Sequence, residues 1–250
     1  MTELFTLEPG EGVGKPIDAD GNGHLDFLSL GLYTSATGIV WLNDGNMGYT
    51  RMDDVFDYSN LLTWKYSIGE TARDFTGDGL VDIVGSRFTS GGNPPTELYL
   101  IEGKGDGNFL DPVELPQKFP YPANLVTAND FDGDGDQDIV GGLDDDGQPG
   151  AAWMLIQDTG DWLPSYPIFD VAPTMNSGSE KPGFGNGSSF DFSGDDYPDV
   201  LVAYAPEECG SYVWGCPQVS DPMDVCYGGD CRKVALIRNL TGNPCGEGGG

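Results

Sequence analysis

The chain has 250 residues, 38% of them hydrophobic, and a formal net charge of −30 from 41 acidic and 11 basic side chains. A hydrophobic fraction of this size can build a core, so the sequence is not that of a disordered acidic tail. The negative charge repels nucleic acid and anionic membranes, and no run of about 20 apolar residues is present. We therefore expect neither nucleic-acid binding nor membrane insertion.

The sequence predicts two clear β-strands in each of four similar units. In every unit an aspartate-rich loop is followed at once by a short apolar, β-prone run and, further on, by a second one. A glycine turn after the second run leads to an aromatic residue in the first three units, Tyr49, Phe109 or Trp162. In chain order, the predicted strands are residues 27–30, 38–42, 83–85, 98–101, 139–141, 153–156, 200–203 and 234–237. Trp41 and Trp153 lie within these strands and are expected in the core.

The near-constant period of the units predicts a repeat architecture. Their first aspartates, Asp18, Asp74, Asp130 and Asp191, are 56, 56 and 61 residues apart. Three or four short strands in a unit of this length form one β-propeller blade, whose apolar faces need neighbours. We therefore predict an all-β fold, a β-propeller of four-stranded antiparallel blades, with residues 1–250 forming one propeller domain or part of a larger ring. The expected blade units are approximately residues 14–66, 67–122, 123–183 and 184–250.

The aspartate-rich loops have the pattern of a site for a hard cation. Each loop spans nine residues, with side-chain oxygens at positions 1, 3, 5 and 9 and a backbone carbonyl expected from position 7. Glycine at positions 4 and 6 lets the backbone curl around an ion. Carboxylate and carbonyl oxygens in a flexible cage suit Ca²⁺ better than Mg²⁺, which demands strict octahedral geometry. The sequence thus predicts up to four bound Ca²⁺ ions.

The four predicted ligand sets differ in their carboxylates. The third loop has four aspartates and is expected to bind most tightly, whereas the fourth loses its second glycine to Asp196 and is expected to be strained and weakest. The predicted ligands are Asp18, Asp20, Asn22, His24 and Asp26; Asp74, Thr76, Asp78, Leu80 and Asp82; Asp130, Asp132, Asp134, Asp136 and Asp138; and Asp191, Ser193, Asp195, Tyr197 and Asp199.

Two other kinds of calcium loop do not fit this pattern. An EF-hand needs a bidentate glutamate at position 12, where this chain has Ser29, Gly85, Gly141 and Val202, and a strand follows instead of a helix. Thrombospondin-type calcium repeats are denser and carry cysteines within each repeat. Acidic turns without a metal remain the alternative, since aspartate and glycine are common in turns.

All five cysteines lie in the last fifth of the chain, four of them in an insertion at residues 205–233. Their proximity favours disulfides between Cys209 and Cys216 and between Cys226 and Cys231, with Cys245 left over. Free thiols in a reducing compartment are the alternative. Disulfides would favour an extracellular or cell-surface location. The first residues lack the pattern of a signal peptide, so we expect an export signal removed, a cytosolic chain or an excerpt of a longer protein.

The run Asp-Phe-Asp-Gly-Asp-Gly-Asp-Gln-Asp-Ile-Val at residues 130–140 resembles the FG-GAP/VCBS repeat family. These repeats form the blades of integrin α-subunit propellers and of many secreted bacterial proteins. The resemblance covers residues from about 14 to 240 and is specific for the calcium loop, while the Phe-Gly and Gly-Ala-Pro marks are mostly missing. It implies structural calcium at the positions given above. It also implies an extracellular binding or adhesion module that recognises a protein or glycan, with flanking domains or blades in the same polypeptide.

The alternative function is a carbohydrate-active enzyme, a polysaccharide lyase or glycosidase on a propeller scaffold. Carboxylate pairs could serve such chemistry, but acidic residues are so abundant that a pair arises easily by chance. His24 is the only histidine and sits in a calcium loop, which argues against a histidine-dependent catalytic site. We therefore expect a binding module more than an enzyme. The candidate ligand-stacking aromatics are Trp64, Trp162, Tyr212 and Trp214, with blade capping as their alternative role.

Overall fold

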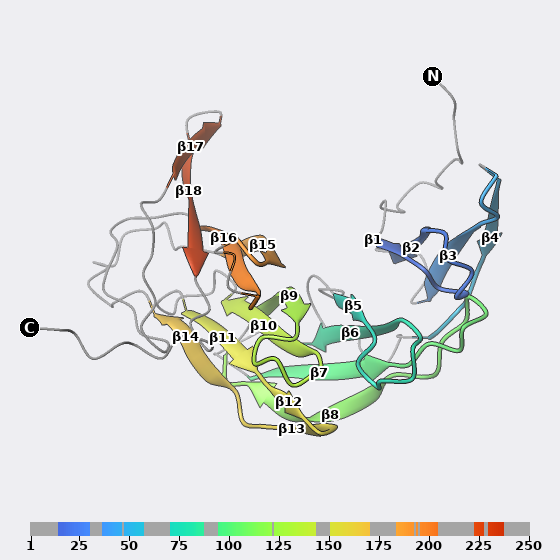
Figure 1. Ribbon diagram of the computed structural model, residues 1–250, viewed down its shortest axis with the longest axis horizontal. Coiled ribbons are helices and arrows are strands. Elements are labelled where there is room, and N and C mark those ends of the chain that lie inside the picture. Colours follow the sequence, from blue (N-terminus) through green and yellow to red (C-terminus); the bar gives the residue numbers. More distant parts are fainter. Residues whose placement is uncertain are drawn as a thin grey trace, which may run out of the picture. The chain divides into compact units, whose positions relative to one another are not determined.

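The computed structural model describes residues 15–30, 37–46, 48–57, 71–87, 95–121, 123–143, 151–170, 184–192, 194, 196–204, 223–227 and 230–237. Across these residues the chain forms strands and turns and contains no α-helix (Figure 1). No helix in this part of the chain is long and apolar enough to cross a membrane. The predicted all-β class is confirmed.

Four four-stranded sheets follow one another along the chain, as blade-type sheets do in a propeller. Their strand orders are β1-β2-β3-β4, β5-β6-β7-β8, β9-β10-β11-β14 and β15-β16-β18-β17, and β12 and β13 form a separate hairpin. The strands of the first two sheets are β1 (Lys15–Ile17), β2 (Asp26–Leu30), β3 (Gly38–Asn43), β4 (Tyr49–Met52), β5 (Thr71–Arg73), β6 (Asp82–Arg87), β7 (Thr96–Ile101) and β8 (Val113–Phe119).

The other two sheets contain the remaining strands. These are β9 (Ala123–Asn129), β10 (Asp138–Leu143), β11 (Ala151–Leu155), β12 (Gln157–Asp158), β13 (Asp161–Trp162), β14 (Tyr166–Asp170), β15 (Phe184–Phe190), β16 (Asp199–Tyr204), β17 (Met223–Tyr227) and β18 (Asp230–Ile237). All eight strands expected from the sequence are present. The prediction of four-stranded antiparallel sheets is confirmed as well.

The fourth sheet departs from the simple order of the other three. Its outer strand β17 precedes β18 in the chain and comes from the cysteine-rich insertion, which the sequence presented as a connection. Tyr227 pairs with Asp230, and Cys226 with Cys231, so β17 and β18 form an antiparallel pair. The insertion therefore contributes a strand to the last sheet.

Each aspartate-rich loop connects the first two strands of its sheet. The last loop residue opens the second strand and pairs with the residue just before the loop. The pairs are Ile17 with Asp26, Arg73 with Asp82, Asn129 with Asp138, and Phe190 with Asp199. The loop is thus the turn of an antiparallel hairpin, with both ends fixed by the sheet.

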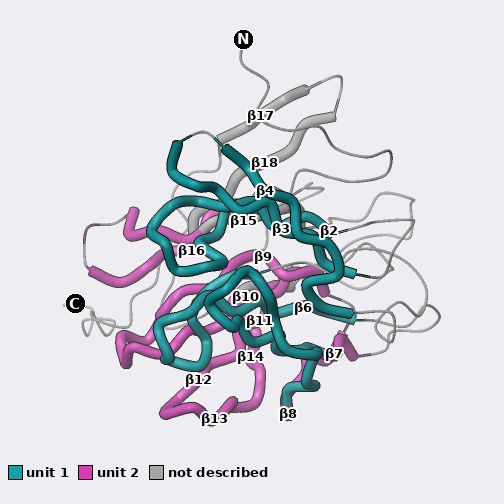
Figure 2. The backbone as a smooth tube through the Cα atoms, turned by 90° about the vertical axis from the view of Figure 1, so that its right-hand side faces the viewer, with its two compact units in different colours: residues 1–89, 98–115 teal, residues 90–97, 116–250 magenta. Residues whose placement is uncertain are grey.

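The chain divides into two compact units (Figure 2). The first comprises residues 1–89 and 98–115, and the second comprises residues 90–97 and 116–250, so the division runs through β7 and β8. The second unit buries Phe119, Phe131, Ile139, Met154 and Ile168 completely. Burial of a side chain of this size stabilises the fold by roughly 1.5–3 kcal/mol.

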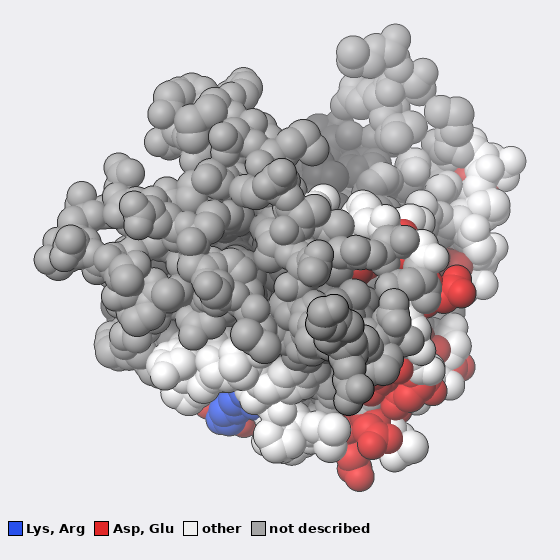
Figure 3. Space-filling view, turned by 60° about the vertical axis from the view of Figure 1, so that its left-hand side comes forward, with Lys and Arg blue, Asp and Glu red and all other residues white. Residues whose placement is uncertain are grey.

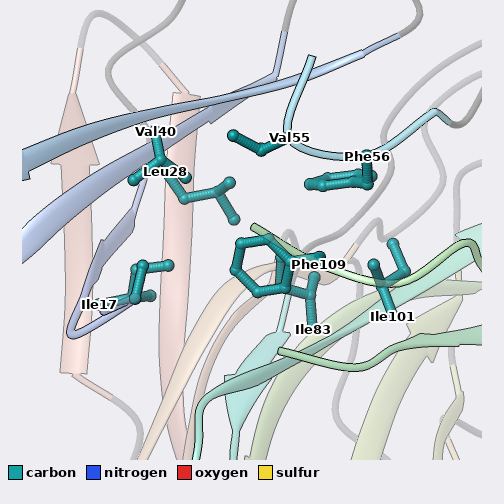
Figure 4. Packing of buried hydrophobic residues seen from close by; sticks show 9 residues of the cluster. Ile17, Leu28, Val40, Val55, Phe56, Ile83, Ile101 and Phe109 are labelled. Atoms are coloured by element: carbon teal, nitrogen blue, oxygen red, sulfur yellow. The ribbon is translucent and has the colours of Figure 1, made fainter. Parts of the chain in front are cut away.

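The core of the first unit joins its two repeats. Figure 4 shows the side chains of this cluster gathered between β2, β3 and the strands of the second sheet. Phe56 of the first repeat meets Phe109 of the second edge-on, with ring centroids 5.6 Å apart. The buried members are Ile17, Ala19, Leu28, Val40, Val55, Phe56, Ile83, Ile101 and Phe109. Neither repeat could bury these residues alone.

The two strand tryptophans differ in burial. Trp41 is buried, as predicted, and the guanidinium of Arg51 lies 5.3 Å from its ring centroid. Trp153 is only half-buried and packs against the exposed Tyr121 at a centroid distance of 6.0 Å. Trp153 is therefore less buried than Trp41, although its indole nitrogen is buried and Leu155, two residues along on the same face of β11, is fully buried.

Candidate metal centres

The carboxylate of the first aspartate in each loop accepts hydrogen bonds from the backbone of the same loop. Its oxygens accept hydrogen bonds from the backbone N–H groups of positions 4 and 6, which the loop geometry brings together. The position-6 donors are Gly23, Gly79, Gly135 and Asp196, at N–O distances of 2.9, 2.9, 3.0 and 3.0 Å. In loops two to four, the position-4 glycines Gly77, Gly133 and Gly194 donate to the same carboxylate. Position 1 thus serves as the anchor of the loop.

The last aspartate of each loop ties it to the rest of the sheet. It accepts a hydrogen bond from the backbone N–H of position 2: Ala19 to Asp26 at 2.8 Å, Phe75 to Asp82 at 3.0 Å, Phe131 to Asp138 at 2.8 Å and Phe192 to Asp199 at 3.1 Å. In the first three repeats its second oxygen accepts the N–H of the residue that begins the distant turn, Asn43, Gly103 or Gln157. The sequence pattern indicated this residue only as a ligand and gave no sign of this second role.

Position 5 and position 7 are also linked within the loop. The side-chain oxygens of Asn22, Asp78 and Asp134 accept the N–H groups of His24, Leu80 and Asp136, at 2.7, 2.8 and 2.8 Å. The position-7 side chains then reach the glycine turn: the ring of His24 lies against Gly45, Leu80 packs on Gly105, and Asp136 accepts the N–H of Gly160 at 3.0 Å. The need for glycine in these turns follows from this contact and from their positive φ angles.

Carboxylates converge in two of the loops. The groups are Asp18, Asp20 and Asp26 in loop one and Asp130, Asp132 and Asp138 in loop three, and in each group one oxygen per residue lies within 4.8 Å of the others. Three like charges at this separation repel one another unless a cation or protons neutralise them. In loop one, Asp18 Oδ1 is buried without a hydrogen-bond partner. These observations fit an oxygen-ligated cation, and both clusters could hold a metal ion.

Loops two and four form no such cluster of acidic side chains in the part of the chain that the structure describes. In loop two, Thr76 replaces a carboxylate, and its hydroxyl donates to Asp82 at 3.2 Å. In loop four, Asp191, Tyr197 and Asp199 are described, whereas Ser193 and Asp195 lie outside the described residues. Asp134 is exposed and engaged with the N–H of Asp136. Ligation at all these positions, and by the position-7 carbonyls, stays a prediction.

Burial raises the pKa of several loop carboxyls. Loss of water is the largest cause for Asp26, Asp82 and Asp138, although backbone N–H groups that donate to each carboxylate act in the opposite direction. For Asp138 the pKa rises to about 7, with Asp132 and Asp130 adding to the shift. Asp132 also has a raised pKa, because burial and the nearby Asp134 and Asp130 disfavour its charge. The third loop therefore brings together carboxyls whose negative charge is disfavoured by burial and by their neighbours.

Acidic side chains are prominent on the described surface. In the view of Figure 3, Asp and Glu side chains gather in groups, while Lys or Arg side chains are few. Two aspartates of the glycine turns, Asp44 and Asp106, have lowered pKa values, because the backbone N–H groups of Asn46 and Asn108 donate to their carboxylates. This surface favours cations over anionic partners.

Only some of the candidate ligand-stacking aromatics and of the cysteines lie among the described residues. Trp162 is half-buried on β13, paired with Gln157. Cys226 and Cys231 are Cα partners in the β17–β18 hairpin. The candidate aromatics Trp64, Tyr212 and Trp214, and the cysteines Cys209, Cys216 and Cys245, lie outside the described residues.

Comparison with known proteins agrees with the loop pattern. A family model described as an FG-GAP-like repeat matches residues 74–141, from the first aspartate of loop two through the strand that follows loop three. No curated protein matches the chain. The matched segment contains one complete period of the array and the loop with the most aspartates. Residues 74–141 thus match an FG-GAP-like repeat, and this segment lies within the residues from about 14 to 240 that the resemblance in the sequence covers.

Proposed function

We propose that this chain is a calcium-stabilised, β-propeller-type binding module of an extracellular or cell-surface protein. The observation that carries the proposal is the convergence of three carboxylates in loop one and again in loop three. Calcium is the cation that suits such a flexible set of oxygen ligands. Each ion would lock the hairpin between the first two strands of a sheet and so stabilise the repeat.

The FG-GAP-like repeat and the cysteine pair support the location. Such repeats are typical of extracellular proteins, and the match covers a full period of this array. The register pairs Cys226 with Cys231 across the β17–β18 hairpin, and such a pairing would suit a cross-strand disulfide. A disulfide there would be stable only in an oxidising compartment. The ligand we propose is a protein or a glycan bound by the module, with Trp162 as a candidate aromatic contact.

Calcium-dependent stability is the first test. We expect millimolar Ca²⁺ to raise the melting temperature above its value in chelator, because an ion that binds only the folded state stabilises it by mass action. Asp132→Asn should lose part of this increase, since it removes a carboxylate from the loop-three cluster and leaves the loop-one cluster intact. Asp111→Asn, which removes an exposed carboxylate outside the loops, serves as the matched control and should keep it. An equal response in both variants would argue against a site in loop three.

Ligand recognition needs a separate test. We expect the Ca²⁺-loaded chain to bind a defined subset of an immobilised glycan or cell-surface protein panel, and to lose binding in chelator. A product assay on every bound glycan separates binding from catalysis, because a lyase or glycosidase would release shorter sugars. Binding without product supports the module, and release of product would favour the enzyme.

A further inference from the structure

Loop one contains an asparagine followed by a glycine, Asn22-Gly23, at positions 5 and 6. The other three loops have an aspartate at position 5 instead. Asn22 and Gly23 are both exposed, so water reaches this peptide. Glycine has no Cβ, and its backbone nitrogen is therefore open to approach by the side chain that precedes it. The amide of Asn22 thus lies next to an accessible backbone nitrogen.

Two hydrogen bonds prepare the Gly23 nitrogen and the Asn22 carboxamide to react with each other. The N–H of Gly23 donates to Asp18 Oδ2 at 2.9 Å, so a carboxylate is in place to take its proton. The N–H of His24 donates to Asn22 Oδ1 at 2.7 Å, where it would stabilise negative charge on that oxygen. Addition of a nitrogen to an amide is assisted by a base at the nucleophile and by a donor at the carbonyl oxygen.

The carboxamide of Asn22 is also held in one orientation. Its nitrogen donates to Asp20 Oδ2 at 3.0 Å and to the carbonyl of Asn43 at 3.0 Å. The backbone N–H of Asn22 donates to the other oxygen of Asp20 at 3.1 Å. Holding the two reacting groups in place lowers the entropic cost of bringing them together. Loop one therefore supplies a base, an oxygen-stabilising donor and a fixed carboxamide around one Asn-Gly peptide.

We propose that Asn22 is a modification site, which deamidates in the folded, metal-free chain through attack of the Gly23 nitrogen on Asn22 Cγ. The new N–Cγ bond closes a succinimide ring as the proton of the Gly23 N–H passes to Asp18. The bond from Cγ to Nδ2 breaks, and the nitrogen takes up that proton and leaves as ammonia. Water then opens the ring at either of its two carbonyls, which gives aspartate or isoaspartate at position 22.

The consequences for cation binding rest on the proposed function. Aspartate at position 22 would give loop one the four aspartates of loop three, at positions 1, 3, 5 and 9. Isoaspartate would add a methylene to the main chain and displace the N–H groups of Gly23 and His24, whose hydrogen bonds close the loop. A bound Ca²⁺ would slow the reaction, because it would occupy the carboxylate of Asp18 that receives the proton.

Peptide mapping by mass spectrometry, after incubation of the whole chain in chelator, tests the proposal. Asn186-Gly187 is the internal control, because it is the other Asn-Gly in the sequence and Gly187 pairs with Val202 within a sheet. We expect Asn22 to deamidate faster than Asn186 in the folded chain, and the two rates to become similar in urea. The same ratio of rates in the folded and the unfolded chain would overturn the proposal, as would an Asn22 that stays unmodified.

Asp18→Asn tests the part played by the carboxylate. Since a positioned base typically contributes about 10²-fold or more, we expect Asn22 to deamidate at least about tenfold more slowly in this variant. Asp74→Asn makes the same change in loop two, where Asp74 accepts the N–H of Gly79, and should leave the rate at Asn22 unchanged. Fragment ions distinguish residue 18 from residue 22, and circular dichroism verifies folding. Equal rates at Asn22 in the two variants would refute the role of Asp18.

The same mapping with Ca²⁺ in place of chelator separates this proposal from the proposed function. We expect Ca²⁺ to slow deamidation of Asn22 and to leave the rate at Asn186 nearly unchanged. A rate at Asn22 that Ca²⁺ does not alter would contradict a bound ion in loop one, whereas the modification itself would stand on the result in chelator.

Discussion

At the scale of single residues, the fourth loop differs from the other three in having an aspartate, not a glycine, at position 6, where the backbone φ angle is positive. Position 6 has a positive φ in every loop, 83° at Gly23, 86° at Gly79, 102° at Gly135 and 70° at Asp196. Only glycine adopts this region without steric cost, which for other residues is roughly 1–2 kcal/mol and less for aspartate. The strain predicted from the sequence for this loop is thus present in the structure.

Asp196→Gly should therefore stabilise the protein by about 0.5–1 kcal/mol, because it relieves the strained φ and keeps the hydrogen bond from the residue's N–H to Asp191. The expected increase in melting temperature is roughly 1–4 °C for a chain of this size. Thermal unfolding in chelator, where no cation contributes, measures it. Gly79→Asp makes the reverse change in loop two and should lower the melting temperature; a loss in both variants would contradict the strain argument.

The carboxyl of Asp138 should make the metal-free protein less stable as pH rises. Its pKa is about 7 in the folded chain, against an ordinary value of 3.8, so the folded state binds the proton more tightly than the unfolded state. Stability from this group is complete below pH 4 and is lost as pH rises through 7. The difference is on the order of 4 kcal/mol. Urea unfolding in chelator at several pH values between 4 and 8 measures this dependence.

Asp138→Asn isolates the contribution of this carboxyl, because the amide does not titrate. The stability of the wild type relative to this variant should fall between pH 4 and pH 7, whereas the stability relative to Asp111→Asn should change little. A constant difference between wild type and Asp138→Asn would refute the assignment. With Ca²⁺ the wild type should gain stability with pH, because the ion competes with the proton for the same carboxylate.

At the scale of elements, the packing of one repeat on the next depends on Gly107. Gly107→Ala should destabilise the protein by about 2–4 kcal/mol, since it combines a strained φ of 84° with the close approach to Met52 and Leu42. Gly79→Ala is the matched control, because its φ is 86° but no atom lies within 4 Å of the added Cβ. Its expected cost is about 1–2 kcal/mol. Equal losses in urea unfolding would show that Gly107 has no packing role.

The strands that the sequence predicted are those whose apolar residues follow directly on a loop aspartate or precede a glycine turn. Residues 83–85 and 139–141 are examples, because burial on both faces produces a continuous apolar run. The short strand β5 was not separately predicted, since Thr71–Arg73 has no apolar pattern and is held by its partner β6. The strand β17 was also missed, because it lies in an insertion without a counterpart in the other repeats.

The candidate site could be predicted at the level of the loop but not of every ligand. Spacing alone identified four candidate loops, and three carboxylates converge in two of them, loops one and three. It could not show that Thr76 donates to Asp82 in loop two, because that depends on the direction of a hydroxyl. Nor could it show that Asp26, Asp82 and Asp138 accept N–H groups from turns 17–21 residues away, since these contacts exist only after the sheet has formed.

At the scale of the whole molecule, the large net charge should make the stability of the fold depend on the salt concentration. Self-repulsion in a chain of charge −30 destabilises the compact state, and added NaCl screens it. In chelator we therefore expect the melting temperature to rise by several degrees between about 0.01 M and 1 M NaCl, as the screening length falls from about 30 Å to 3 Å. Differential scanning calorimetry over this range measures the increase.

Calcium should act beyond this screening, because a bound ion would neutralise clustered carboxylates that are buried or half-buried, where mobile salt screens them less. At equal ionic strength, millimolar Ca²⁺ should therefore raise the melting temperature more than NaCl does. Its effect should persist at about 1 M NaCl, where exposed charges interact little. Asp132→Asn should retain the NaCl response and lose part of the Ca²⁺ response, because only the second depends on the loop-three cluster. Identical effects of Ca²⁺ and NaCl at matched ionic strength would indicate that the loops are acidic turns without a bound ion, and would contradict the proposal of structural calcium.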